Sequence, residues 1–263
     1  MFTFRKTKTP IDLLTKPFFA KYRPQHAETV ARLIDRKSKV SHRSKFAFFR
    51  IPKAASSTAF KTLYLCENEM PAHDYDHRVA KTSYARFSEL SHRQVIELEE
   101  RYFKFTIVRN PWSRIASAYL DKIVNASGAL RGVKGWHVLQ YYNRKRGARI
   151  TFREFCDYLK FGDGVYDNAH WAAQSVLVNI PISQLDYIGK METLEKDLTH
   201  IMKEIFRRSE HPPIFDLQRY QTNASSHLHE LYDDHTENIV RELYEDDFVN
   251  FRYDMTEVNS RER

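Results

Sequence analysis

Residues 50–58, Arg-Ile-Pro-Lys-Ala-Ala-Ser-Ser-Thr, are the first group in this chain whose types and spacing could do chemistry. Small side chains around a lysine are typical of loops that hold a phosphate-like anion, because the anion can approach backbone N–H groups while the lysine adds a full charge. The ATPase loop G-x-x-x-x-G-K-[ST] is excluded, since no glycine precedes Gly128. One alternative stays open, a turn followed by an ordinary helix whose cap is one of the three hydroxyl residues. The candidate anion-binding residues are Arg50, Lys53, Ala54, Ala55, Ser56, Ser57 and Thr58.

A second candidate anion site follows at residues 109–117, Arg-Asn-Pro-Trp-Ser-Arg-Ile-Ala-Ser. Arg109 comes directly after an apolar stretch, and Ser117 lies within the helix expected next, so both side chains could reach one anion. Two such segments, each with a basic residue at its turn, suit a nucleotide that carries phosphate at two ends.

Strands and helices around these segments must bring them together. The apolar runs 46–51 and 102–108 predict buried strands, and the patterns at 59–66 and 115–124 predict the helices that follow. Pro52 marks the end of the first strand, because proline cannot donate a ladder hydrogen bond. Two strand–loop–helix units predict an α/β fold, in which ligands bind at the carboxyl ends of the strands.

Further elements follow from the same patterns. We expect a helix over 87–102 with Ser91 as its cap, and a helix that starts at the capping box of Thr151 and Glu154. A short strand is expected at 187–190. Two more helical stretches are expected at 194–206 and 229–249.

The two candidate segments together resemble sulfotransferases that use 3′-phosphoadenosine 5′-phosphosulfate (PAPS). The likeness is greatest to the carbohydrate sulfotransferases of the chondroitin 4-O, HNK-1 and heparan or uronyl 2-O kind (sulfotransferase family 2). Residues 50–58 resemble that family's 5′-phosphosulfate loop, and residues 107–122 resemble its 3′-phosphate motif. The likeness runs over roughly residues 46–253 through further segments at 169–174, 185–198, 223–226 and 243–253.

The resemblance implies a P-loop-NTPase-like three-layer fold, with a central, mostly parallel sheet flanked by helices. It implies PAPS as co-substrate, PAP as product, no metal, and a carbohydrate or glycan hydroxyl as acceptor. Lys53 would neutralise charge on the leaving phosphate, with Arg50 adding charge to the same group. Arg109 and Ser117 would bind the 3′-phosphate.

The acceptor hydroxyl must lose a proton, and a histidine with a pKa near neutrality suits that role. In related enzymes a histidine precedes the second motif by about thirty positions, and His77 fits this placement. His170 is the alternative, as a base or as a residue that orients one of the substrates. An exposed loop histidine without a role is the remaining interpretation of His77.

Composition indicates one sizeable folded domain. The chain has 263 residues, of which 42% are hydrophobic, and its net charge is +8. We expect an irregular N-terminal arm over 1–45, one sulfotransferase domain over 46–255 and a tail over 256–263. The basic balance suits PAPS and would also suit an acidic glycan, so it does not require nucleic acid as a partner.

No stretch approaches the roughly 20 apolar residues of a membrane span, and no signal-peptide pattern opens the chain. We therefore expect no integral membrane segment. A complete chain of this kind would be a soluble, cytoplasmic enzyme. Animal members of the family are usually Golgi proteins with an anchor, so a Golgi location is expected only if an anchor had been removed.

Two other classes of function stay open. One is a nucleotide-dependent kinase of related fold, although the sequence lacks the GK[ST] loop. The other is a non-catalytic basic module that binds a polyanion, which would account for the charge but not for two ordered motifs.

Overall fold

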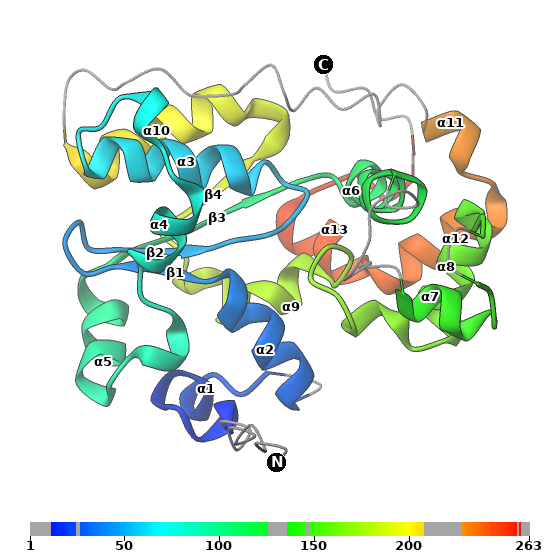
Figure 1. The fold of residues 1–263 in the computed structure, drawn as a ribbon, viewed down its shortest axis with the longest axis horizontal. Helices are drawn as coiled ribbons and strands as arrows, with labels where there is room; N and C mark the ends of the chain where they lie inside the picture. The colour runs from blue at the N-terminus through cyan, green and yellow to red at the C-terminus, as the bar shows by residue number, and fades with distance from the viewer. Residues whose placement is uncertain are drawn as a thin grey trace, which may run out of the picture.

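A four-stranded sheet lies at the centre of the chain in the computed structural model, which describes residues 12–24, 27–125, 136–145, 148–207, 228–256 and 258 (Figure 1). Strand β1 is antiparallel to β2, whereas β2, β3 and β4 are parallel to one another in that order. The parallel strands therefore end at one edge of the sheet, where the next residues are Arg50, Arg109 and Met191. The strands are β1 (Lys39–Ser41), β2 (Phe46–Phe49), β3 (Phe103–Val108) and β4 (Tyr187–Lys190).

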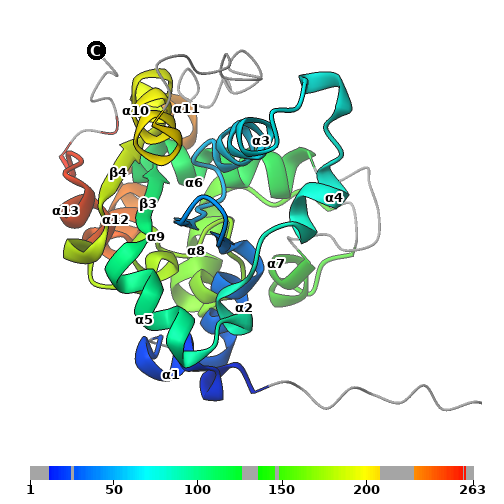
Figure 2. The same cartoon turned by 90° about the vertical axis from the view of Figure 1, so that its left-hand side faces the viewer.

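Helices cover both faces of this sheet, which confirms the predicted three-layer α/β fold (Figures 1 and 2). Phe46 and Phe48 of β2 pack toward α3 and α10, while Ala47 and Phe49 pack toward the opposite layer. This alternation follows from the two-residue period of a strand. Phe48 stacks on Phe105 of β3, with ring centroids 4.6 Å apart. The covering helices are α3 (Ser56–Glu67) and α10 (Leu194–Phe206) on one face, and α1 (Pro17–Lys21), α2 (Ala27–Lys37), α5 (His92–Arg101) and α9 (Gln174–Val178) on the other.

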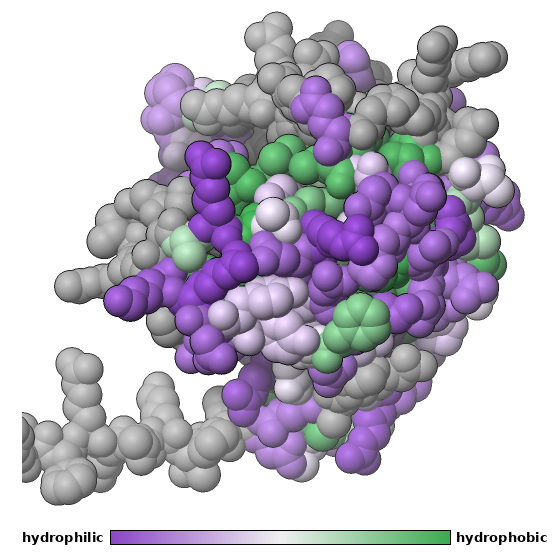
Figure 3. Space-filling model, turned by 90° about the vertical axis from the view of Figure 1, so that its right-hand side faces the viewer, coloured by the Kyte–Doolittle hydropathy of each residue, from purple (hydrophilic) through white to green (hydrophobic). Residues whose placement is uncertain are grey.

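A helical region with its own core extends beyond the carboxyl ends of the strands. Trp112, Phe155 and Trp171 are fully buried there. The face of this region in Figure 3 is mostly hydrophilic, with apolar areas between the polar ones. Its elements are α6 (Pro111–Tyr119), a π-helical turn (Leu120–Val124), α7 (Trp136–Tyr141), α8 (Phe152–Phe161), α11 (Leu228–Leu231), α12 (Asp234–Leu243) and α13 (Glu245–Phe251).

The expectation of an irregular arm over 1–45 is wrong for most of its described part. Residues 27–37 form α2, whose Val30 and Ile34 are buried against the sheet, and β1 pairs with β2. Pro17 is the first residue of α1, where proline is tolerated, and Pro24 lies before α2. Residues 27–37 therefore belong to a layer that covers the sheet, and residues 39–41 belong to the sheet itself.

Most other predicted elements are confirmed, with shifted bounds. Ser91 caps α5, as expected, the predicted capping box of Thr151 and Glu154 starts α8, and α10 spans the predicted 194–206. The helix expected over 115–124 starts earlier, at Pro111, and changes into the π-helical turn after Tyr119. Short elements fill the connections: η1 (Leu13–Thr15), η2 (Ala72–Asp74), α4 (His77–Thr82), η3 (Phe87–Glu89), η6 (Gly164–Tyr166), η7 (Ile182–Gln184) and η8 (Met191–Thr193).

Candidate active site

The loop between β2 and α3 has the backbone of an anion-binding loop. Lys53 and Ala55 adopt left-handed conformations, with φ of 71° and 50°. Ala55 is the N-cap of α3 and makes no side-chain capping bond, so the alternative of a helix capped by Ser56, Ser57 or Thr58 does not hold. Thr58 Oγ1 is buried and has no hydrogen-bond partner among the described residues. An uncapped helix start and a buried hydroxyl both suit an anion placed there.

Arg109 joins the second predicted segment to this loop. Its side chain is almost fully buried, and its Nη1 donates to the backbone oxygen of Lys53 at 3.4 Å. Its Nε donates to Ser113 Oγ at 2.9 Å, which holds the guanidinium against α6. Ser117, one turn further along α6, lines the same cavity. The structure thus brings the two predicted segments together, as the sequence suggested.

Gln174 fixes the backbone at Arg109. Its side-chain oxygen accepts from the Arg109 N–H at 3.0 Å, and its side-chain nitrogen donates to the Arg109 carbonyl at 2.8 Å. The fully buried carboxylate of Asp247 in turn accepts from the backbone N–H groups of Gln174 and Ser175, both at 2.7 Å. Helices α9 and α13 therefore hold the carboxyl end of β3 in place.

Arg114 is a positioning residue that the sequence analysis did not single out. It is fully buried; its Nε donates to the Pro52 carbonyl and its Nη2 to the Ala169 carbonyl, each at 3.2 Å. Burial lowers the pKa of this guanidinium, and the Asp247 carboxylate opposes that effect. Arg114 thereby ties the loop of Lys53 to the segment that carries His170.

Replacing Arg114 by methionine should lower the free energy of unfolding by about 3 kcal/mol, because two buried carbonyls lose their donor and the buried Asp247 loses a nearby positive charge. Urea unfolding measures this. Arg153→Met, which removes an exposed ion pair to Asp233, is the control and should change stability by about 1 kcal/mol or less. A loss below that of the control would contradict the role given to Arg114.

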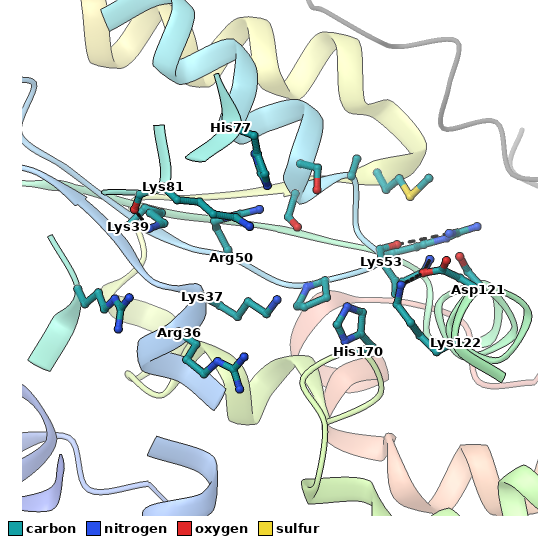
Figure 4. Close-up of a pocket in the computed structure, with 18 of the residues that line it drawn as sticks. Arg36, Lys37, Lys39, Arg50, Lys53, His77, Lys81, Asp121, Lys122 and His170 are labelled. Carbon is teal, nitrogen blue, oxygen red and sulfur yellow. Dashed lines mark hydrogen bonds and ion pairs between the residues drawn. The ribbon is translucent and has the colours of Figure 1, made fainter. Parts of the chain in front are cut away.

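Lys53 itself points along the cavity wall toward α6 and the turn that follows it (Figure 4). Its Nζ lies 3.0 Å from Asp121 Oδ2, and Asp121 also pairs with Lys122. Burial is the main effect that lowers the pKa of Lys53, and Asp121 opposes it. The two contacts with lysines outweigh burial at Asp121 and hold the pKa of that carboxyl below its usual value.

A cavity of about 820 Å³ is lined by Lys53, Arg109, Ser117, Asp121 and the start of α3. Among the described residues that line it, ten are Lys or Arg and one, Asp121, is acidic, so the cavity suits a multiply charged anion. The sequence predicted the parts around Lys53, Arg109 and His77, but it did not reveal the basic residues that α2, β1 and the rest of α4 contribute. The basic lining residues are Arg36, Lys37, Lys39, Arg50, Lys53, Arg78, Lys81, Arg86, Arg109 and Lys122.

Arg50 and Lys39 line the cavity from the sheet. The Arg50 guanidinium lies over the ring of Phe60, 4.5 Å from its centroid, and lines the cavity. Lys39 is buried, and its Nζ donates to the Lys81 carbonyl at 2.7 Å. Burial, together with the charge of Arg50, lowers the pKa of Lys39 to about 8.

Both candidate bases line the cavity, from different elements (Figure 4). His77 is the first residue of α4, and its Nδ1 lies 2.9 Å from the hydroxyl of Tyr75. Burial and the charges of Lys81 and Arg50 lower the pKa of His77. His170 is largely buried, and its Nδ1 lies 2.7 Å from Asn168 Oδ1.

The other predicted features have different outcomes. Trp171 is buried and donates to the Gly164 carbonyl, so it belongs to the core. The segment 223–226 lies outside the described residues. Over the part of the chain that the structure describes, no group of three His, Cys, Asp or Glu side chains is placed to hold a metal. Within the same residues, no helix has both the length and the apolar character needed to cross a membrane.

The sequence of this chain matches a family model and several known proteins. A family model described as "Sulfotransferase family" matches residues 36–254. Carbohydrate sulfotransferase 14 of Danio rerio is 27% identical over 177 residues, which cover 63% of this chain and 47% of that protein. Carbohydrate sulfotransferase 10 of Homo sapiens is 28% identical over 193 residues, covering 63% and 51%. The chain thus matches about half the length of these relatives. No solved structure matches it.

These relatives also correct one expectation. A cytoplasmic location was expected for a complete chain, and that expectation is wrong, because the relatives that the chain matches are carbohydrate sulfotransferases.

Proposed function

This chain belongs to the sulfotransferase family, and we propose that it transfers a sulfo group from PAPS to a hydroxyl of a carbohydrate. The observation that carries the proposal is the single basic cavity into which the Lys53 loop and the Arg109–Ser117 segment both open. Two anion-binding segments at the ends of neighbouring parallel strands are what a nucleotide with phosphate at two ends requires.

The described residues fit such a donor. At one end, the start of α3 and the unpartnered hydroxyl of Thr58 would receive the 5′-phosphosulfate, with Lys53 and Arg50 adding charge. At the other end, Arg109 and Ser117 would bind the 3′-phosphate. When bound, PAPS supplies the sulfo group, and its phosphate is the leaving group.

Two tasks remain, the stabilisation of charge on the leaving group and the removal of the acceptor's proton, and we assign them to Lys53 and a histidine. The Lys53 ammonium would stabilise negative charge that develops on the leaving phosphate oxygen, as electrostatic catalysis requires. His77 would accept the proton of the acceptor hydroxyl. Its neutral form is favoured, since burial and two neighbouring cations lower its pKa. His170, held by Asn168, would orient a substrate from the other side of the cavity.

An acidic carbohydrate is the acceptor class that we propose. Six basic side chains line the cavity from outside both nucleotide segments, and four of them are Arg36 and Lys37 at the end of α2, Lys39 in β1 and Lys81 in α4. Figure 4 shows these four on the side of the cavity away from Lys53. Carboxylate or sulfate groups on the acceptor would pair with these cations.

Thermal unfolding with PAP, with ATP–magnesium and with heparin tests the donor assignment. PAP at about a hundredfold excess over its dissociation constant should raise the melting temperature by roughly 5 °C or more. Stabilisation by ATP–magnesium but not by PAP would instead support a kinase. Stabilisation by heparin alone would support a non-catalytic polyanion-binding module.

Transfer of labelled sulfate from PAPS across a panel of acceptors tests the rest. The panel should hold acidic glycans, their neutral counterparts and small alcohols. Acidic glycans should be the best acceptors, with rates that fall as salt screens the cavity. Equal transfer to neutral glycans would contradict the acidic class, and transfer to small alcohols alone would contradict a carbohydrate acceptor.

A further inference from the structure

Asp121 is the feature of the cavity that the proposed function leaves without a role. Among the described residues that line the cavity it is the single carboxylate. A carboxylate repels an anionic donor, so by itself it weakens donor binding. A role for Asp121 beside Lys53 must therefore compensate for this loss of donor affinity.

The local backbone places Asp121 where it can reach Lys53. Asp121 follows Ser117 by four residues and belongs to the π-helical turn, Leu120–Val124, that continues α6. Such turns inside helices occur frequently at functional sites. The 3.0 Å contact between Asp121 Oδ2 and Lys53 Nζ thus joins the helix of the 3′-phosphate segment to the loop of the 5′-phosphosulfate segment.

Lys53 needs an anionic neighbour to keep its charge. Its side chain is only 15% exposed, and burial favours the neutral amine. The nearby cations Lys122, on the same turn, and Arg109, at the end of β3, act in the same direction, whereas Asp121 favours the ammonium. His170, in the loop before α9, is the other titratable group in this part of the cavity. An ammonium has three N–H donors, so Lys53 can keep Asp121 and still donate to a donor oxygen.

We propose that Asp121 is a positioning residue, which holds the Lys53 side chain in its cationic form and directs it at the leaving phosphate. The inference rests on the proposed use of PAPS. It assigns Asp121 no contact with either substrate. Loss of the carboxylate should therefore weaken donor binding only where Lys53 loses its proton.

Asp121→Asn tests this through the affinity for PAP, measured by titration calorimetry at pH 6 and pH 9. At pH 6 Lys53 is protonated in both proteins, and the variant should bind PAP as tightly as the wild type or tighter, because a repulsive charge has gone. At pH 9 a larger fraction of Lys53 is neutral in the variant than in the wild type, because Asp121 no longer favours the ammonium, and the variant should bind up to about tenfold more weakly. The dissociation constant of the variant divided by that of the wild type should thus cross from one or less at pH 6 to above one at pH 9.

Two controls keep the interpretation specific. In the Lys53→Met background, Asp121→Asn should no longer show the crossing, since the group that titrates is absent. Lys122→Met removes the other lysine on Asp121, and it should weaken PAP binding at both pH values without a crossing. A ratio that stays the same at both pH values, or a crossing that persists without Lys53, would overturn the proposal. If the wild type itself fails to bind PAP, the proposed function falls first and this inference with it.

Discussion

Lys53→Met should abolish sulfo transfer while the fold stays intact. Methionine keeps an unbranched apolar stem in a wall that is largely buried, but it removes the charge that we propose acts on the leaving phosphate. Removal of one preorganised electrostatic contact of this kind lowers kcat by about 10²–10³-fold. PAP affinity should fall by about tenfold, because one charge-assisted hydrogen bond is lost.

Labelled-PAPS transfer and PAP titration measure the two effects of Lys53→Met. Its melting temperature should stay close to that of the wild type, since Asp121 keeps its contact with Lys122. Lys61→Met is the matched control, because Lys61 lies on α3 against the ring of Tyr75 and does not line the cavity. It should retain transfer. Retention of more than about a tenth of the activity in Lys53→Met would remove Lys53 from its assigned role.

His77→Ala should lower transfer by about 10²–10⁴-fold and leave PAP binding nearly unchanged, since a general base acts on the acceptor. His170→Ala should have a smaller effect on transfer. The reverse result, with transfer lost only in His170→Ala, would move the base to His170.

The pH profile gives an independent test of His77. A base must be neutral, so transfer should fall as pH drops through its pKa. Burial, Lys81 and Arg50 lower that pKa below the ordinary value of 6.5, so the acidic limb of the pH profile should lie below pH 6.5. Lys81→Met removes one of these cations and should move the acidic limb to higher pH. A limb that stays in place in Lys81→Met would contradict His77 as the titrating group.

Local patterns were enough to predict the elements that carry the donor site. The apolar runs before Arg50 and Arg109 predict β2 and β3, because buried parallel strands are apolar on both faces. The capping box of Thr151 and Glu154 located the start of α8, since its two residues lie three positions apart in sequence. The order of the two segments along the chain then sufficed to indicate one nucleotide site.

Contacts between segments that lie far apart in the chain could not be predicted from local sequence patterns. Strand β1 has only three residues and forms because β2 offers it a partner, so its own sequence does not reveal it. The basic residues at the end of α2 were consequently assigned to an arm rather than to the cavity. Arg114 and Asp121 are ordinary helix residues in the sequence, and only the tertiary structure shows that one is fully buried and the other faces Lys53.

The left-handed backbone at Lys53 and Ala55 limits which substitutions can stabilise the protein without loss of activity. A non-glycine residue in that conformation costs roughly 1–2 kcal/mol relative to the usual one, so selection for stability alone would favour glycine at both positions. At position 53 that substitution would also remove the ammonium. Stabilising changes and transfer activity should therefore oppose each other in this loop, which makes it a poor region in which to seek a more robust form of the enzyme.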